Sequence, residues 1–231
     1  MNTDRVLAWV GVAIGILGLI PIFRDASLQL AIAYTIVLAL LLILFAFLYR
    51  SGRGPQYATL SMKKTLRIVE TDGSLARMSR EQRIRVNYGQ LSEIWCRNIV
   101  ADGSIQNLLI DKSPPDDEKR MGCLLSICKR FSTPLFRGQE ATILWTHELL
   151  NAFPAINERM EHDVTPETLY LELIVELPNS RPCRAATLHE SVSGEPARLL
   201  PDPTIELHGT VLKAVVKRPR EGRTICLSWE W

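Results

Sequence analysis

Two uncharged segments near the start of the chain constrain its fold more than any other feature. Residues 6–23 ("VLAWVGVAIGILGLIPIF") and 28–49 ("LQLAIAYTIVLALLLILFAFLY") contain no charged side chain. About 20 helical residues, each rising 1.5 Å, cover the roughly 30 Å hydrocarbon core of a bilayer. Because only residues 24–27 link the segments, the two helices would be antiparallel neighbours. The sequence therefore predicts a two-helix transmembrane hairpin in residues 1–50.

Basic residues near the ends of the spans predict the orientation of the hairpin, since they are retained on the cytoplasmic side. Five basic residues lie between Arg50 and Arg67, and no acidic residue comes before Glu70. A signal peptide is the competing interpretation, but no small-residue cleavage site follows Phe23 and a second span comes at once. The expected location is the inner membrane, with both termini cytoplasmic. Residues 51–62 would form a basic flexible neck.

Gly11, Gly15 and Gly18 lie in the first predicted span. Small residues spaced by four on one helix face allow another helix backbone to approach closely. The partner could be the second span of the same chain or a helix of another copy. The glycines therefore predict helix packing in the bilayer and leave self-association open.

From residue 63 to 231 the hydrophobic period is two rather than 3.6. Ile84 and Val86, for example, alternate with Arg83 and Arg85, as in a strand with one buried face. Nine or ten such segments, separated by turn signals, indicate a cytosolic domain rich in β-strands. We expect an antiparallel β-sandwich of the immunoglobulin-like kind or a small β-barrel. Residues 113–120 and 151–166 break the pattern and are predicted as loops.

Enzyme and metal motifs are not evident in the sequence. The four histidines are scattered, and no nucleophile elbow, Walker A loop, H-E-x-x-H or Rossmann fingerprint is present. The five cysteines are irregularly spaced and form no zinc set. A net charge of +2 is too weak to indicate binding of double-stranded nucleic acid. The sequence thus predicts no catalytic residue, no metal and no cofactor.

Candidate ligand-binding residues come from strands that combine aromatic and basic side chains. An indole and a guanidinium on one face could hold a base or a phosphate. Ordinary strand residues, half-buried or solvated, are the alternative for each candidate. The candidates are Trp95, Arg97, Asn98, Lys129 and Arg130.

Trp229 and Trp231 pose a similar choice at the end of the chain, because they share one face of the last predicted strand. They could close the hydrophobic core. They could instead form a stacking platform for a ligand.

The layout of two spans, a basic neck and a β-rich domain resembles the two-transmembrane effectors of bacterial cyclic-oligonucleotide anti-phage (CBASS-type) systems. The resemblance implies that the β domain binds a cyclic nucleotide, and that the chain then assembles and disrupts the inner membrane. The lipid bilayer and other copies of the chain would be its partners. The alternative is a constitutive membrane-tethered module whose sheet edge recruits a protein partner by strand addition.

Overall fold

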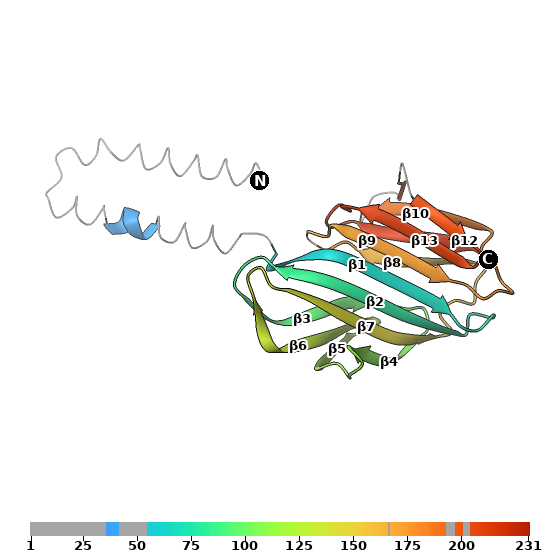
Figure 1. The fold of residues 1–231 in the computed structure, drawn as a ribbon, viewed down its shortest axis with the longest axis horizontal. Helices are drawn as coiled ribbons and strands as arrows, with labels where there is room; N and C mark the ends of the chain where they lie inside the picture. Colours follow the sequence, from blue (N-terminus) through green and yellow to red (C-terminus); the bar gives the residue numbers. More distant parts are fainter. Residues whose placement is uncertain (1–35, 42–54, 166, 193–196, 201–203) are drawn as a thin grey trace. The chain divides into compact units, whose positions relative to one another are not determined.

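The computed structural model describes residues 36–41, 55–165, 167–192, 197–200 and 204–231 (Figure 1). The chain divides into two compact units, Met1–Gly54 and Pro55–Trp231. We describe each unit by itself.

The first unit does not support the predicted membrane hairpin. Its described residues, 36–41, are helical. Among the described residues, no helix is long and apolar enough to cross a membrane. The predicted hairpin and inner-membrane location are corrected accordingly. The first span, with Gly11, Gly15 and Gly18, and most of the second lie outside the described residues.

The second unit is built from strands arranged in three sheets (Figure 1). The main sheet has seven strands in the order β12-β13-β9-β1-β2-β7-β4. In that order they span Thr204–His208, Val211–Lys217, Tyr170–Glu176, Tyr57–Ile68, Leu75–Val86, Glu140–Leu150 and Ser104–Ile110. Since β1 begins at Tyr57, residues 57–62 belong to a strand rather than to the predicted neck.

Two smaller sheets complete the second unit. The four-stranded sheet has the order β11-β10-β14-β8 and spans Arg198–Leu199, Ala185–Ser191, Thr224–Glu230 and Asn157–Asp163. The three-stranded sheet has the order β3-β6-β5 and spans Gln90–Ile99, Leu124–Phe136 and Asp117–Met121. Strands β3 and β8 are therefore edge strands of their sheets.

The main sheet is mixed, so the prediction of an antiparallel sandwich or small barrel is wrong. Strand β1 pairs with β2 in the antiparallel sense and with β9 in the parallel sense. A parallel pair cannot be joined by a tight turn and needs a long crossover. Turn signals between neighbouring segments therefore gave no indication of the β1–β9 pairing.

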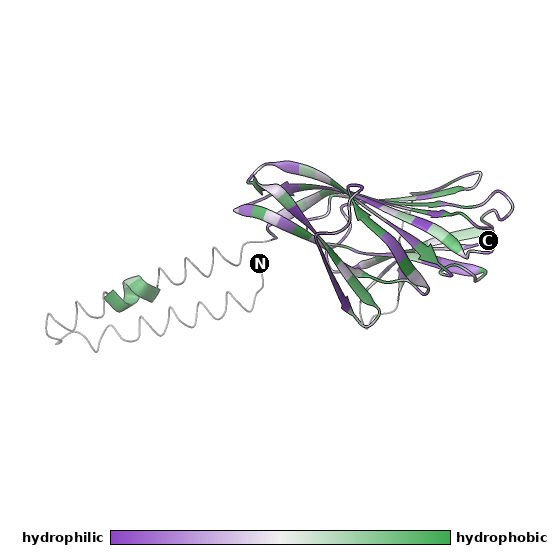
Figure 2. Cartoon of the chain, turned by 90° about the horizontal axis from the view of Figure 1, so that it is seen from below, coloured by the Kyte–Doolittle hydropathy of each residue, from purple (hydrophilic) through white to green (hydrophobic). Residues whose placement is uncertain are grey.

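Both smaller sheets pack on the same face of the main sheet. Along each strand of the main sheet, the residues that contact a smaller sheet alternate with the others and so point to one face. Figure 2 shows this alternation as green and purple bands along the strands. One hydrophobic cluster joins the main sheet to the four-stranded sheet and includes Met62, Leu66, Leu173, Leu188 and Leu227. A second joins it to the three-stranded sheet and includes Ile84, Ile94, Ile127, Ile143 and Trp145.

The C-terminal strand closes the first of these clusters. Trp229 and Trp231 are 2% and 3% exposed, and the Trp229 ring lies 6.1 Å from that of Phe153. The Nε1 of Trp231 donates to the Ala155 carbonyl at 2.6 Å, and the Arg181 guanidinium lies 3.7 Å from the centre of its ring. Both tryptophans are core residues and not a stacking platform.

Two glycine turns hold the connection between β7 and β8. A Cβ on Gly73, whose φ is +76°, would lie 1.7 Å from the Phe153 carbonyl oxygen. A Cβ on Gly103 would lie 1.8 Å from the carbonyl oxygen of Leu150. Only glycine permits such approaches of two backbones. These turns position the segment that leads into β8.

Two segments predicted as loops contain strands. Strand β5 lies partly within residues 113–120, and β8 lies within residues 151–166. Each has few apolar residues and so gives a weak strand signal. Strand β8 also forms one wall of a cleft in this unit.

Candidate functional site

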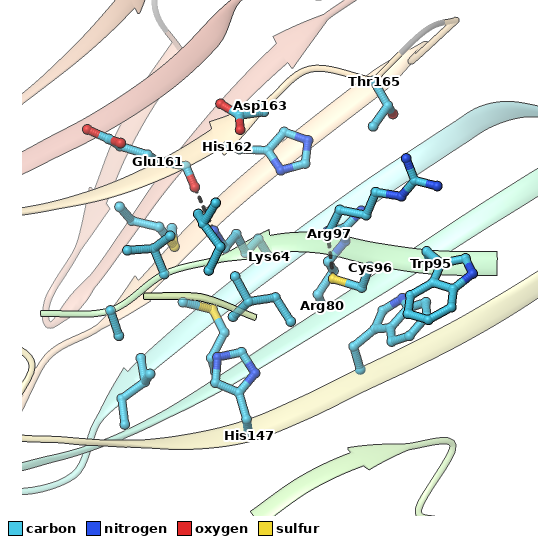
Figure 3. A pocket seen from close by; sticks show the side chains of 18 of the residues that line it. Lys64, Arg80, Trp95, Cys96, Arg97, His147, Glu161, His162, Asp163 and Thr165 are labelled. Carbon is cyan, nitrogen blue, oxygen red and sulfur yellow. Dashed lines mark hydrogen bonds between the residues drawn. The ribbon is translucent and has the colours of Figure 1, made fainter. Parts of the chain in front are cut away.

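A cleft of about 1110 Å³ lies between the two hydrophobic clusters. Its floor comes from β1, β2 and β7 of the main sheet. Its walls include the edge strand β3 on one side and the edge strand β8 on the other. Figure 3 shows side chains from all of these strands around the same space.

The floor carries a band of polar residues on a face that is otherwise apolar. On β1, Lys64 points to the same face of the sheet as the buried Met62 and Leu66. On β2, Arg80 points to the same face as the buried Met78 and Ile84. In natural sheets, positions that break the buried pattern usually have a function. The band is made of Lys64, Arg80 and His147, which line the cleft, and of Gln82, which is buried beside Arg80.

Lys64 and Arg80 are direct partners in the antiparallel β1–β2 pair. The Nζ of Lys64 donates to the backbone carbonyl of Glu161 in β8 at 2.6 Å. The Nη1 of Arg80 donates to Cys96 Sγ in β3 at 3.1 Å, and its Nη2 donates to Gln82 Oε1 at 3.2 Å. Neither cation forms an ion pair with a carboxylate among the described residues. Two like charges facing each other in a sheet are destabilising.

Burial and neighbouring positive charges lower the pKa values of the basic groups in the cleft. Loss of solvent, followed by the charge of Arg80, lowers the pKa of Lys64 to about 8. Burial, followed by the charge of Lys64, lowers the pKa of His147 to about 4. Burial together with Arg80 and Lys64 holds the pKa of His162 well below its usual value. Both imidazoles are therefore neutral at pH 7, beside two cations.

Three buried polar atoms at the cleft have no hydrogen-bond partner in the described part of the chain. They are Arg80 Nε, Trp145 Nε1 and His162 Nε2. His162 is 5% exposed and Trp145 is 1% exposed, so bulk water does not readily satisfy them. Buried polar groups are nearly always hydrogen-bonded, and an unsatisfied group calls for an explanation such as a ligand or an ordered water.

Carboxylates also line the cleft and are mostly engaged with other groups. Glu161 pairs with Arg159 at 3.1 Å, and Asp163 accepts from the Thr224 hydroxyl at 2.7 Å. Glu93 accepts from Trp95 Nε1 at 3.0 Å. Glu93, Asp102, Glu161 and Asp163 are exposed. Glu158 is partly buried, as Lys64 and Arg80 are, and accepts from the Ala155 N–H at 2.6 Å. Lys64 and Arg80 at the floor of the cleft thus have no carboxylate ion-pair partner among the described residues, although carboxylates line the cleft around them.

The structure brings together two of the five residues predicted as a ligand site. Trp95 and Arg97 of β3 both line the cleft. Arg97 is exposed and forms no ion pair among the described residues, while Lys119 lies 4.3 Å from the centre of the Trp95 ring. Asn98 belongs to β3, but its side chain is outside the described part of the structure.

Lys129 and Arg130 lie outside the cleft and are engaged in ion pairs. Lys129 Nζ is 2.8 Å from a carboxylate oxygen of Asp111. Arg130 pairs with Glu93 at 3.7 Å and with Asp117 at 3.6 Å. These two residues are therefore not available to hold a ligand together with Arg97.

The sequence analysis missed Lys64, Arg80, His147 and His162. A signal was present for the first two, because extending the alternation of the buried residues along β1 and β2 places a cation at a buried position. No such signal marks His162, whose strand is mostly polar. No three His, Cys, Asp or Glu side chains in the described part of the chain form a group that could hold a metal ion.

Neither a family model nor a curated protein matches this chain. Solved structures that resemble it include an M1 zinc metallopeptidase from Deinococcus radiodurans, with 9% identity and a TM-score of 0.41 over 76% of this chain and 42% of that one. Native yeast LTA4 hydrolase is also similar, with 12% identity and a TM-score of 0.43 over 75% and 29%. A putative protease from Parabacteroides distasonis has 11% identity and a TM-score of 0.43 over 76% and 40%.

This chain spans less than half the length of those solved structures. The prediction of a membrane-disrupting effector is corrected, because no helix among the described residues is long and apolar enough to cross a membrane. The membrane-tethered alternative is corrected on the same ground, and the prediction of a non-enzymatic protein is withdrawn as well. Similarity at these TM-scores assigns no activity to this chain.

Proposed function

We propose that the second unit is a binding domain that takes a small anionic ligand in the cleft between its sheets. The observation that carries the proposal is the set of buried donors and cations, centred on Lys64 and Arg80, that lack a carboxylate partner among the described residues. An anion between the walls would offset the repulsion of the two cations and accept from the unsatisfied donors.

The chemistry of the walls supports a ligand that carries both an anionic group and an unsaturated or apolar part. Lys64 and Arg80 are suited to a phosphate or a carboxylate. Leu91, Ile94 and Trp145 also line the cleft and provide apolar contacts. A cleft of this volume accommodates ligands of nucleotide size. A cyclic nucleotide belongs to this chemical class.

Calorimetric titration with matched pairs of compounds tests the proposal. Each pair consists of an anionic compound and its neutral parent, such as adenosine monophosphate and adenosine, and a cyclic dinucleotide is included. We expect at least one anionic member to bind while its neutral parent does not. Arg80→Gln and Arg97→Gln should each weaken binding by about tenfold or more, because a hydrogen bond to a charged group contributes roughly 1.5–3 kcal/mol.

Arg85→Gln is the matched control. Arg85 lies on β2 like Arg80, but it is exposed and points to the opposite face of the sheet, away from the cleft. This variant should bind as the unmodified protein does. Binding that does not depend on charge, or that is weakened equally by Arg85→Gln, would contradict the proposal.

A further inference from the structure

Lys64 has the surroundings of a reactive amine. It lines the cleft, so a small molecule can reach it, and it is partly buried. Its cross-strand partner is another cation, Arg80. Desolvation and a neighbouring positive charge are the two conditions that activate a lysine as a nucleophile.

The same two conditions lower the Lys64 pKa to about 8. At pH 7.5 a far larger share of such amines is neutral than the roughly 0.1% of a lysine with the ordinary pKa of about 10.4. The neutral amine is the nucleophilic form. The hydrogen bond from Nζ to the Glu161 carbonyl, 2.6 Å long, fixes the position of the nitrogen against the β8 wall.

We propose that Lys64 forms an imine with an anionic aldehyde or ketone held in the cleft. The inference rests on the proposed function, since Arg80 and Arg97 would bind the anionic group and bring the carbonyl carbon to Nζ. It goes further by assigning covalent chemistry to one residue and a carbonyl group to the ligand.

The reaction needs no oxidant or reductant. The lone pair of the neutral amine attacks the carbonyl carbon, and the carbon–oxygen π bond breaks to give a carbinolamine. The nitrogen loses a proton, the hydroxyl group is protonated, and it leaves as water as the carbon–nitrogen double bond forms. His147 and His162 line the same cleft, and both imidazoles are neutral at pH 7, so either can accept a proton.

Reductive trapping tests the proposal on the full chain. The probe is pyridoxal 5′-phosphate, which carries an aldehyde and a phosphate, and borohydride reduces any imine to a stable secondary amine. Peptide mass mapping then compares Lys64 with Lys63, its exposed neighbour on the opposite face of β1. At pH 7.5 we expect labelling of Lys64 to exceed that of Lys63 by tenfold or more. Pyridoxal, which lacks the phosphate, should label Lys64 several-fold more slowly.

Two conservative variants sharpen the test. Lys64→Arg should abolish the fast labelling, while Lys63→Arg should leave it unchanged. Equal labelling of Lys63 and Lys64 would overturn the imine proposal. If anions still bound the cleft in that case, the proposed function would stand. If pyridoxal labelled Lys64 as fast as pyridoxal 5′-phosphate does, the inference of a reactive amine would stand. The proposed anion site would then be contradicted.

Discussion

Lys64 and Arg80 face each other across β1 and β2, yet their charged groups contact opposite walls of the cleft. Lys64 Nζ bonds to the Glu161 carbonyl in β8, and Arg80 Nη1 bonds to Cys96 Sγ in β3. Each cation thus ties the main sheet to a different smaller sheet. The arrangement keeps two positive charges on adjacent strands and leaves the space between the walls as a site for an anion.

A double-mutant cycle should detect the repulsion between these two cations. In urea unfolding, the double variant Lys64→Gln, Arg80→Gln should be less stable than the sum of the two single changes predicts, by about 0.2–1 kcal/mol. Each single change removes the repulsion, so the sum of the two single effects counts this gain in stability twice. The double change gains it only once. Lys63 and Glu81, opposite charges paired on the outer face of the same two strands, provide a control cycle with coupling of the opposite sign. Additive effects at Lys64 and Arg80 would mean that the pair does not interact.

Stability should fall as the pH decreases from about 6.5 to 4. His147 has a pKa of about 4 in the folded protein and about 6.5 when unfolded, so the unfolded chain binds more protons in this range. Protonation therefore favours unfolding, with a loss of about 1.4 kcal/mol for each unit by which the pKa is lowered. Urea titrations at several pH values measure this slope, and His147→Gln should reduce it. His162, whose pKa is shifted in the same direction, should retain part of the remainder, together with Glu148, whose pKa is lowered by hydrogen bonds from Asn107 and Arg77.

The exposed His208 on β12 provides the control for this experiment. The free energy of unfolding of the His208→Gln variant should still change with pH, and its slope should be steeper than that of the His147→Gln variant. An equal effect of both changes would refute the assignment of the slope to the cleft.

Alanine substitutions at three glycines should separate backbone contact from backbone conformation. Gly103→Ala should cost about 1–3 kcal/mol or more, because its Cβ would overlap the Leu150 carbonyl. Gly138→Ala should cost only the roughly 1–2 kcal/mol of a left-handed conformation, since φ is +84° and the site is open. Gly73→Ala combines both effects and should be the most destabilising. Equal midpoints in urea for the three variants would disprove the contact between the turns and the β7–β8 connection.

Trp231→Ala should destabilise the second unit by about 3–5 kcal/mol, as expected for a buried tryptophan. Arg181→Ala removes the cation over the Trp231 ring and should cost less, about 0.5–2 kcal/mol. Arg184→Ala, which removes an exposed ion pair with Glu230, should cost no more than about 1 kcal/mol. Urea midpoints measure all three. A Trp231→Ala variant as stable as Arg184→Ala would show that the C-terminus does not close the core.

The local alternation of the sequence determined most of the strands and their buried faces. Ile84 and Val86 are buried, while Arg83 and Arg85 are exposed, as the pattern predicts. Strand β8 was missed because Met160 is its only strongly apolar residue, so its burial depends on contacts that alternation does not encode. The pattern also placed Trp95 and Arg97 on one strand, where both line the cleft.

Tertiary structure alone decided which strands pair and which side chains meet. Lys64 and the Glu161 carbonyl are 97 residues apart in the sequence and 2.6 Å apart in the fold. Likewise, β1 and β9 form a parallel pair that no turn between them could predict. Local periodicity reports only which face of a strand is buried, whereas strand order depends on the packing of all three sheets. The sequence by itself therefore determined the β character and the buried faces of this domain, and the fold determined the cleft.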